Sequence, residues 1–154
     1  MCRRVLAVLV ALGCLALAAT PSANAQAPTI VTDITFPEDG APFGTFTATA
    51  PLCPSGTFVD EFVGGGGAFG SDRVFYNANT VRKMFTCADG SGTFTILFHP
   101  QFTPATPADC LQAGPFAVVG GTGAYAHLRG TGDFCNFPEG ERVTETFTGR
   151  FRLS

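Results

Sequence analysis

The stretch FAVVGGTGAYAHLRGTG, residues 116–132, decides the fold. Its first four residues are apolar and predict a short strand. The glycines that follow predict a sharp reversal or a bulge, because glycine reaches positive φ and lets a second backbone approach closely. Tyr125 and Leu128, three positions apart, lie on one side of a single helical turn. The glycines at 130 and 132 then lead into a second strand, so we expect Tyr125 and Leu128 to cover one end of a β-structure.

The same glycines match the spacing of a dinucleotide-binding loop. Residues 121–126 read G-x-G-x-x-A, and residues 65–70 read G-x-G-x-x-G. Such a loop needs a full crossover helix and an acidic residue about 20 positions later, inside a βαβ unit. Gly130 and Gly132 end any helix after residue 121 almost at once. We therefore interpret these glycines as structural.

Alternating residues rich in Thr, Phe and Val predict strands along the rest of the chain. The predicted strands are residues 29–36, 43–50, 57–63, 73–77, 81–87, 93–99, 116–119, 131–137 and 142–153. Clusters of Gly, Pro and Asp between them, such as residues 37–40, 64–67 and 88–92, predict turns. Eight or nine short strands at near-regular spacing favour an antiparallel barrel or sandwich.

Residues 119–130, V-G-G-T-G-x-Y-x-x-L-R-G, resemble the signature of the allene oxide cyclase and dirigent family of β-barrels. The resemblance implies an all-β fold, an antiparallel up-and-down β-barrel of about eight strands. It also implies that any activity consists mainly of holding a reactive apolar substrate in a shaped cavity. The functional residues of the family lie outside the matching segment, so no site residue is assigned from the resemblance.

The N-terminus has the pattern of a secretory signal peptide. Two arginines precede an apolar run at residues 5–19, and Ala-Asn-Ala at residues 23–25 offers a small-residue cleavage site. We expect cleavage after residue 25, which leaves residues 26–154 as one secreted barrel domain. A lipid anchor at Cys14 is the minor alternative. A membrane span is disfavoured, since the apolar run is shorter than the ~20 residues that cross a bilayer.

Removal of residues 1–25 makes the chain more acidic. Nine basic residues become seven against twelve acidic ones, and the net charge moves from -3 to -5. No basic patch is visible in what remains. The composition therefore disfavours a nucleic acid or an anionic membrane surface as the partner.

Four cysteines follow the predicted cleavage site, an even number that suits an oxidising compartment. Four cysteines allow three pairings. Cys53 precedes the strand at 57–63 and Cys87 ends a later strand, so antiparallel pairing brings both to the same end. Cys110 and Cys135 stand in the same relation to the strands around residues 116–132. We therefore predict the disulfides Cys53–Cys87 and Cys110–Cys135.

Catalytic signatures are missing from the chain. There is no G-x-S-x-G elbow, H-E-x-x-H pair, P-loop or C-x-x-C pair. His99 and His127 are the only histidines, and a metal site would need further ligands near them. We expect no metal and no cofactor, with both histidines in polar surface roles.

Glu145 is a polar residue on an apolar strand face. Val143, Phe147, Phe151 and Leu153 share one face of the last strand, and period-2 alternation carries Glu145 onto the same face. A buried carboxylate is costly unless it is paired. Glu145 is therefore either part of a site or half of an ion pair.

Asp60 lies in the same way between Phe58 and Phe62. Arg82 and Arg150 are candidate partners of the two carboxylates. Strand phase shifts at a bulge, so a structural interpretation with both carboxylates in solvent stays open. The candidate ligand-binding residues are Asp60, Glu145, Arg82 and Phe147.

Three functions stay open at this point. The first is a barrel that binds or orients a small apolar molecule in its lumen without covalent catalysis. The second is an isomerase or cyclase in which Asp60 or Glu145 moves a proton, for which a raised carboxyl pKa would be the mark. The third is a disulfide-stapled structural or surface protein with a filled core.

The phenylalanine content predicts association. The chain holds 16 phenylalanines and no tryptophan. That number exceeds what we expect a narrow eight-stranded lumen to hold, so some rings should lie on an outer face that another subunit covers. We therefore expect a homo-oligomer, a dimer or a trimer.

Overall fold

The structure is a computed structural model that describes residues 27–69, 75–102, 106–139 and 142–154. These residues form nine strands and one 3₁₀ turn, η1. The elements in chain order are β1 Thr29–Thr35, β2 Phe43–Ala48, β3 Ser55–Phe69, β4 Phe75–Cys87, β5 Thr93–Phe98, β6 Gln101–Phe102, β7 Gln112–Gly121, η1 Gly123–Tyr125, β8 Arg129–Glu139 and β9 Arg142–Arg152. The prediction of an all-β chain is confirmed.

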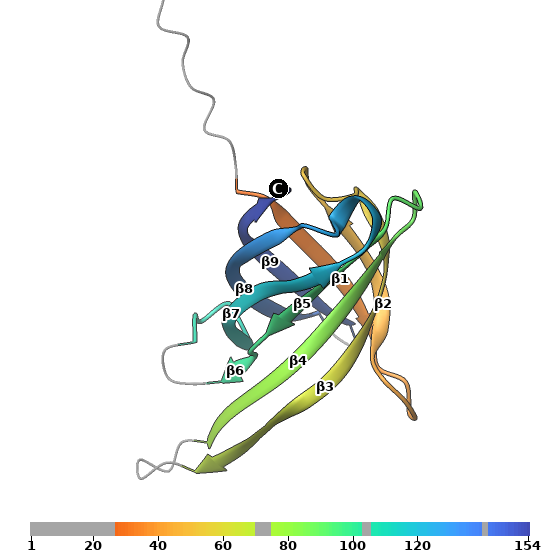
Figure 1. Ribbon diagram of the computed structural model, residues 1–154. Coiled ribbons are helices and arrows are strands. Elements are labelled where there is room, and N and C mark those ends of the chain that lie inside the picture. The colour runs from red at the N-terminus through yellow and green to blue at the C-terminus, as the bar shows by residue number, and fades with distance from the viewer. Residues whose placement is uncertain (1–26, 70–74, 103–105, 140–141) are drawn as a thin grey trace, which may run out of the picture.

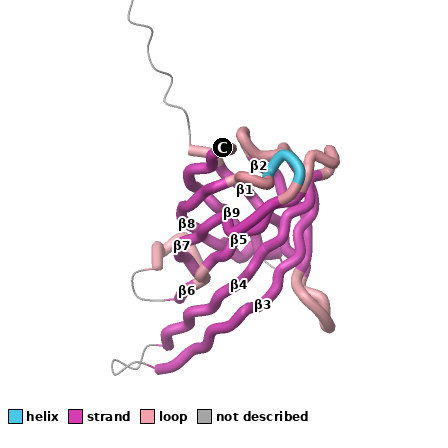
Figure 2. Tube along the Cα trace, in the orientation of Figure 1, coloured by secondary structure: helices cyan, strands magenta, loops and turns pink. Residues whose placement is uncertain are grey.

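The strands form a closed antiparallel barrel of eight strands (Figures 1 and 2). Each long strand pairs with the next one along the chain, and β9 returns to pair with β1. The two-residue strand β6 is an addition that bridges β4 and β7. Closure removes the exposed edges that an open sheet would present. The predicted up-and-down barrel is thus confirmed.

One predicted turn is wrong. The glycines at 64–67 belong to β3, which pairs with β4 without interruption except for a register shift between Phe62 and Gly64. The two strands extend beyond the rest of the barrel as a long hairpin (Figure 1). Backbone pairing with β4 outweighs the low strand preference of glycine here. The strands predicted at 73–77 and 81–87 are accordingly one strand, β4.

The glycine stretch folds as expected. The register of β5 with β7 shifts around Val119, which is the predicted bulge. The turn η1 has only three residues, which is too short for the crossover helix of a nucleotide-binding loop. Tyr125 and Leu128 are buried and cover one end of the barrel, here called the η1 end. At the opposite end, here called the Asp60 end, β2 begins and the β3–β4 hairpin continues outward.

The interior is packed with aromatic rings. Nine phenylalanines are buried: Phe46, Phe58, Phe85, Phe94, Phe98, Phe116, Phe134, Phe147 and Phe151. Phe85 stacks on Phe94 with ring centroids 4.6 Å apart, and Phe98 lies 4.8 Å from Phe134. The barrel interior therefore holds nine of the 16 phenylalanine rings. Among described side chains, Phe36, Phe43, Phe62 and Phe102 are exposed.

Both predicted disulfides are present. Cys53–Cys87 has its Cα atoms 5.9 Å apart and lies toward the η1 end. Cys110–Cys135 has its Cα atoms 5.5 Å apart and joins the segment before β7 to the outer side of β8. The strand-direction argument is confirmed by these two pairs.

Within the described residues, no helix has the length and apolar character needed to cross a bilayer.

Candidate functional site

The structure places Asp60 and Glu145 in the barrel interior. Their exposed fractions are 7% and 4%, and each follows the inward phase of its strand. Asp60 lies on β3 next to buried Phe58, and Glu145 lies on β9 two residues before buried Phe147. The two carboxylates reach the interior from different sides of the barrel.

Lys83 joins the two carboxylates. Its Nζ lies 2.8 Å from Asp60 Oδ1 and 2.8 Å from Glu145 Oε2, and its side chain is fully buried. Asp60 and Lys83 are direct cross-strand partners on β3 and β4. Thr32, the cross-strand partner of Glu145 on β1, donates a hydrogen bond to Glu145 Oε2 at 2.9 Å. These four residues, Thr32, Asp60, Lys83 and Glu145, are called the polar layer below.

Aromatic rings enclose the polar layer. Lys83 Nζ lies 3.6 Å from the centroid of Phe58 and 5.6 Å from that of Phe98. Phe147 lies one step deeper than Glu145, with its ring centroid 5.2 Å from Phe98 and 5.1 Å from Phe134. Cation–π attraction to Phe58 adds to the two ion pairs that hold the ammonium in place.

The polar layer carries one negative charge in excess when all three groups are ionised. Burial raises the pKa of Asp60 to about 6, and the charge of Glu145 adds to this effect, whereas Lys83 lowers it. Lys83 donates its hydrogen bond to Asp60 Oδ2 at 2.9 Å. Oδ1 is in ion-pair contact with the ammonium but accepts no hydrogen bond.

Arg82 is not a partner of either interior carboxylate, which corrects the expected pairing. Its guanidinium pairs with Glu61 at 2.6 Å, and the two side chains are 40% and 52% exposed. Arg82 has the opposite strand phase from Phe85, so it points away from the interior. Arg150 is exposed as well. The partner that sequence reasoning missed is Lys83. It lies two residues before Phe85 on β4 and points to the same inner face.

Phe62 also departs from expectation. It follows the inward phase of Asp60, yet 64% of it is exposed. The reason is that β2 begins at Phe43, opposite Val59, so β3 beyond Asp60 has only β4 as a neighbour. Phe62 faces Val81, its half-buried partner on β4. The two side chains form an apolar rim directly outside the polar layer.

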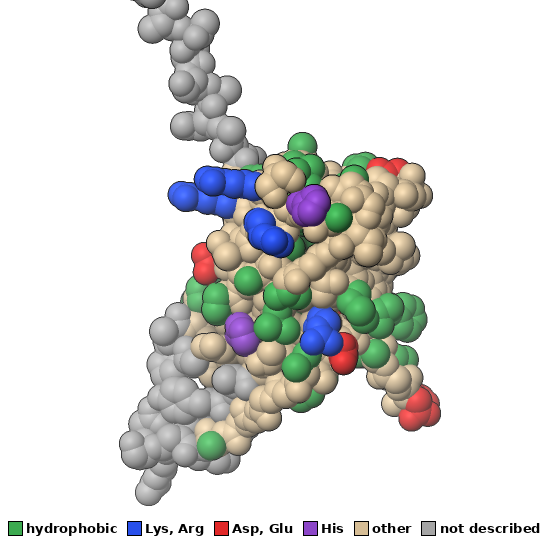
Figure 3. All heavy atoms as spheres, viewed as in Figure 1, with side chains coloured by type: hydrophobic (Ala, Val, Ile, Leu, Met, Phe, Trp, Pro, Cys, Tyr) green, Lys and Arg blue, Asp and Glu red, His purple; other side chains and the backbone are tan. Residues whose placement is uncertain are grey.

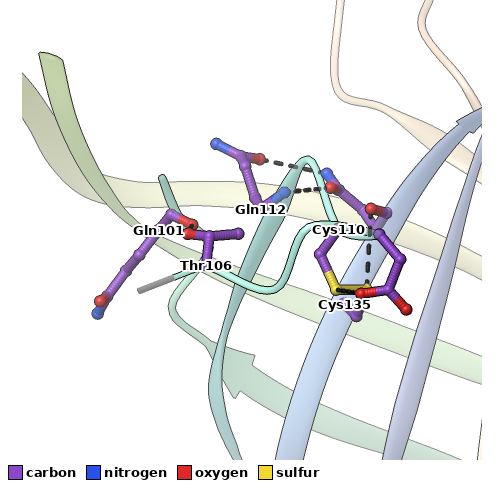
Figure 4. Close-up of a disulfide and its surroundings, with 7 residues drawn as sticks. Gln101, Thr106, Cys110, Gln112 and Cys135 are labelled. Carbon is purple, nitrogen blue, oxygen red and sulfur yellow. Dashed lines mark hydrogen bonds between the residues drawn. A yellow bond between two sulfur atoms is a disulfide. The ribbon is translucent and has the colours of Figure 1, made fainter. Parts of the chain in front are cut away.

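A separate cavity of about 560 Å³ lies on the outer face of β7, β8 and β9. Its wall is the segment before β7, which the Cys110–Cys135 disulfide holds against β8 (Figure 4). Beside the disulfide, the Gln112 backbone nitrogen donates to Asn136 Oδ1 at 2.7 Å. Thr146 and Thr148 line this cavity from β9. It is therefore distinct from the polar layer, which faces the other side of the strands.

Neither histidine belongs to the polar layer or lines the outer cavity. His99 Nδ1 lies 3.2 Å from Thr80 Oγ1, and His127 is exposed in the turn after η1. Within the described residues, no group of three His, Cys, Asp or Glu side chains is arranged to hold a metal ion.

Comparison with known proteins gives no relative. No protein-family model, curated protein or solved structure matches the chain.

Proposed function

We propose that the protein is an exported β-barrel that binds a small, largely apolar molecule at the Asp60 end and positions it without covalent catalysis. One observation carries the proposal: a buried cluster with an excess negative charge adjoins exposed Phe62 on the same inner face. Replacing a buried ion pair by apolar residues is often neutral or stabilising, so stability alone is a weak reason for such a cluster. Recognition of a ligand is a function for which the cluster is suited.

The packing restricts where the ligand lies. Nine buried phenylalanine rings fill the barrel interior, and two of them, Phe58 and Phe98, lie against Lys83. The ligand therefore lies between the polar layer and the rim, with its apolar part against Phe62 and Val81. Its polar end points to Asp60, whose Oδ1 has no hydrogen bond from the protein.

Export and family membership belong to the same proposal. Disulfides are typical of proteins in oxidising compartments. A closed barrel with the glycine stretch at one end agrees with the resemblance to allene oxide cyclase and dirigent barrels. The predicted signal peptide, residues 1–25, lies outside the described residues. Terminal sequencing of the protein recovered from the medium tests this part, and the expected first residue is Gln26.

Displacement of a hydrophobic fluorescent probe tests the binding proposal. We expect wild type to take up the probe and Glu145→Gln to bind it several-fold more weakly, because the variant changes the polar layer. Glu61→Gln is the matched control, since Glu61 is exposed on the outer side of the same barrel.

Asp133→Asn reports on the outer cavity, which Asp133 lines. A loss of probe with Asp133→Asn alone would locate the site on the outer face and contradict the proposal. Equal uptake by all variants, or no uptake by wild type, would favour a structural protein with a filled core.

An isomerase or cyclase is the second candidate, and the pKa of Asp60 favours it. A carboxyl whose burial raises its pKa to about 6 can both give and take a proton near neutral pH. Asp60→Asn separates the two functions. In a binding protein this variant changes affinity only, whereas in an isomerase the molecule recovered from the variant differs from the one recovered from wild type.

A further inference from the structure

Three arginines converge on the outer face of the barrel, away from the polar layer. Arg129 begins β8, and Arg150 and Arg152 lie near the end of β9. Arg129 is the direct cross-strand partner of Arg152, and Thr131 is the partner of Arg150. These four residues and Gly130 line a cavity of about 240 Å³. Figure 3 shows blue side chains gathered at one end of the barrel.

The three arginines differ from the other described basic side chains in having no acidic partner. Lys83 pairs with two carboxylates, Arg82 with Glu61, and Arg142 lies 3.9 Å from Asp33. No carboxylate of the described residues lies within ion-pair distance of Arg129, Arg150 or Arg152, and none lines their cavity. Like charges directly opposite on paired strands are destabilising. This arrangement therefore lacks a counter-charge within the described protein.

The cluster corrects the expectation that the chain has no basic patch. The sequence holds twelve acidic residues and nine basic ones. Three of those nine meet at one place only because β8 and β9 pair in the register that sets Arg129 against Arg152. At least twenty residues separate Arg129 from the other two arginines, so the patch becomes visible only in the fold.

We propose that the cavity between Arg129, Arg150 and Arg152 binds the phosphate group of a small phosphate monoester. Guanidinium groups offer paired N–H donors that match the oxygens of a phosphate. Thr131 lines the same cavity, and its hydroxyl group is a further hydrogen-bond donor for a phosphate oxygen. Three positive charges match the double negative charge of a phosphate monoester. A carboxylate carries a single negative charge, which one guanidinium group is enough to balance. The site lies outside the barrel interior, so it stands independently of the ligand proposed there.

Titration calorimetry with phenyl phosphate and inorganic phosphate tests this site, in chloride buffer at constant ionic strength. We expect both probes to bind wild type. The double variant Arg150→Gln/Arg152→Gln should bind each at least about tenfold more weakly, because charge-assisted hydrogen bonds are lost. Arg82→Gln removes one exposed arginine from another strand. Its affinity for both probes should stay within about twofold of the wild-type affinity. Without phosphate, the double variant should unfold no more readily than wild type, since like-charge repulsion is relieved.

Three results would overturn the proposal. Equal weakening by Arg82→Gln would mean that only net charge matters. Absence of binding by both probes to wild type would remove the phosphate site. Binding to vesicles that contain phosphatidylglycerol, with neither soluble probe bound, would assign the arginines to a membrane surface instead.

Discussion

At Lys83 two physical effects oppose each other. Burying an ammonium and two carboxylates costs several kcal/mol for each ion, and contacts of 2.8 Å between opposite charges offset that cost. The balance depends on all three groups together. Removal of one member leaves the others buried without a matching charge. Substitutions in this layer should therefore lower the free energy of unfolding much more than substitutions of exposed neighbouring residues.

Lys83→Met should therefore destabilise the barrel by about 3–5 kcal/mol near neutral pH. The variant leaves Asp60 and Glu145 close together with no cation between them. Urea unfolding measures the effect. Arg82→Met is the control, because its ion pair is exposed and should contribute no more than about 1 kcal/mol. Similar losses in both variants would contradict the role assigned to Lys83.

Asp60 should make the protein more stable in mild acid. Burial raises its pKa from 3.8 to about 6, so between these values the folded protein binds a proton that the unfolded chain does not. The contribution of this group to the free energy of unfolding therefore grows as the pH falls through 6 and reaches about 3 kcal/mol once the pH is below 3.8. Unfolding midpoints of wild type and Asp60→Asn across this pH range test the effect. Asp60→Asn should lack this gain in stability. If the unfolding midpoints of the two proteins changed in parallel with pH, protonation of Asp60 would not be the cause.

At the scale of elements, the glycine turn joins β7 to η1 through close backbone contact. A Cβ on Gly121 would collide with the carbonyl oxygens of Tyr125 and Thr93, whereas a Cβ on Gly120 would meet no atom. Gly121→Ala should therefore cost about 2 kcal/mol or more, and Gly120→Ala should be nearly neutral. Thermal unfolding of the two variants measures the difference. Equal stability would show that the turn relaxes freely.

The two disulfides act on different elements. Cys53–Cys87 closes a segment with a sequence separation of 34 residues, and its loss should cost about 2–5 kcal/mol. Loss of Cys110–Cys135 should in addition free the segment that forms the wall of the outer cavity. Non-reducing peptide mapping checks the pairs. Recovery of a peptide that joins Cys53 to Cys110 would contradict the strand order.

How far the sequence predicts the elements depends on whether the signal is local. Period-2 alternation was sufficient to predict the inward faces of Asp60 and Glu145, because it depends only on neighbouring residues. The same alternation indicates Lys83 as well, because Lys83 and Phe85 are two residues apart on β4 and therefore share a face. The hairpin through residues 64–67 and the arginine cluster depend on the register in which consecutive strands pair. Strand register is not visible in a single sequence.

At the scale of the whole molecule, an apolar row crosses the outer face. Phe43, Val59 and Met84 are neighbours on β2, β3 and β4, and all three are exposed. We predict that this row is covered in a dimer or trimer. Val59→Lys should give a monomer in sedimentation, whereas Thr57→Lys, on the same side of β3, should not. A monomeric wild type at micromolar concentration would contradict the prediction.

The claim that the barrel carries a small apolar molecule at its Asp60 end is tested most directly by native mass spectrometry of the protein recovered from the medium of cells that make it. We predict a discrete added mass on the wild-type chain that is released on unfolding. This added mass should be strongly reduced in Glu145→Gln but not in Glu61→Gln. A bare chain in all three samples, or the same added mass in all three, would contradict it.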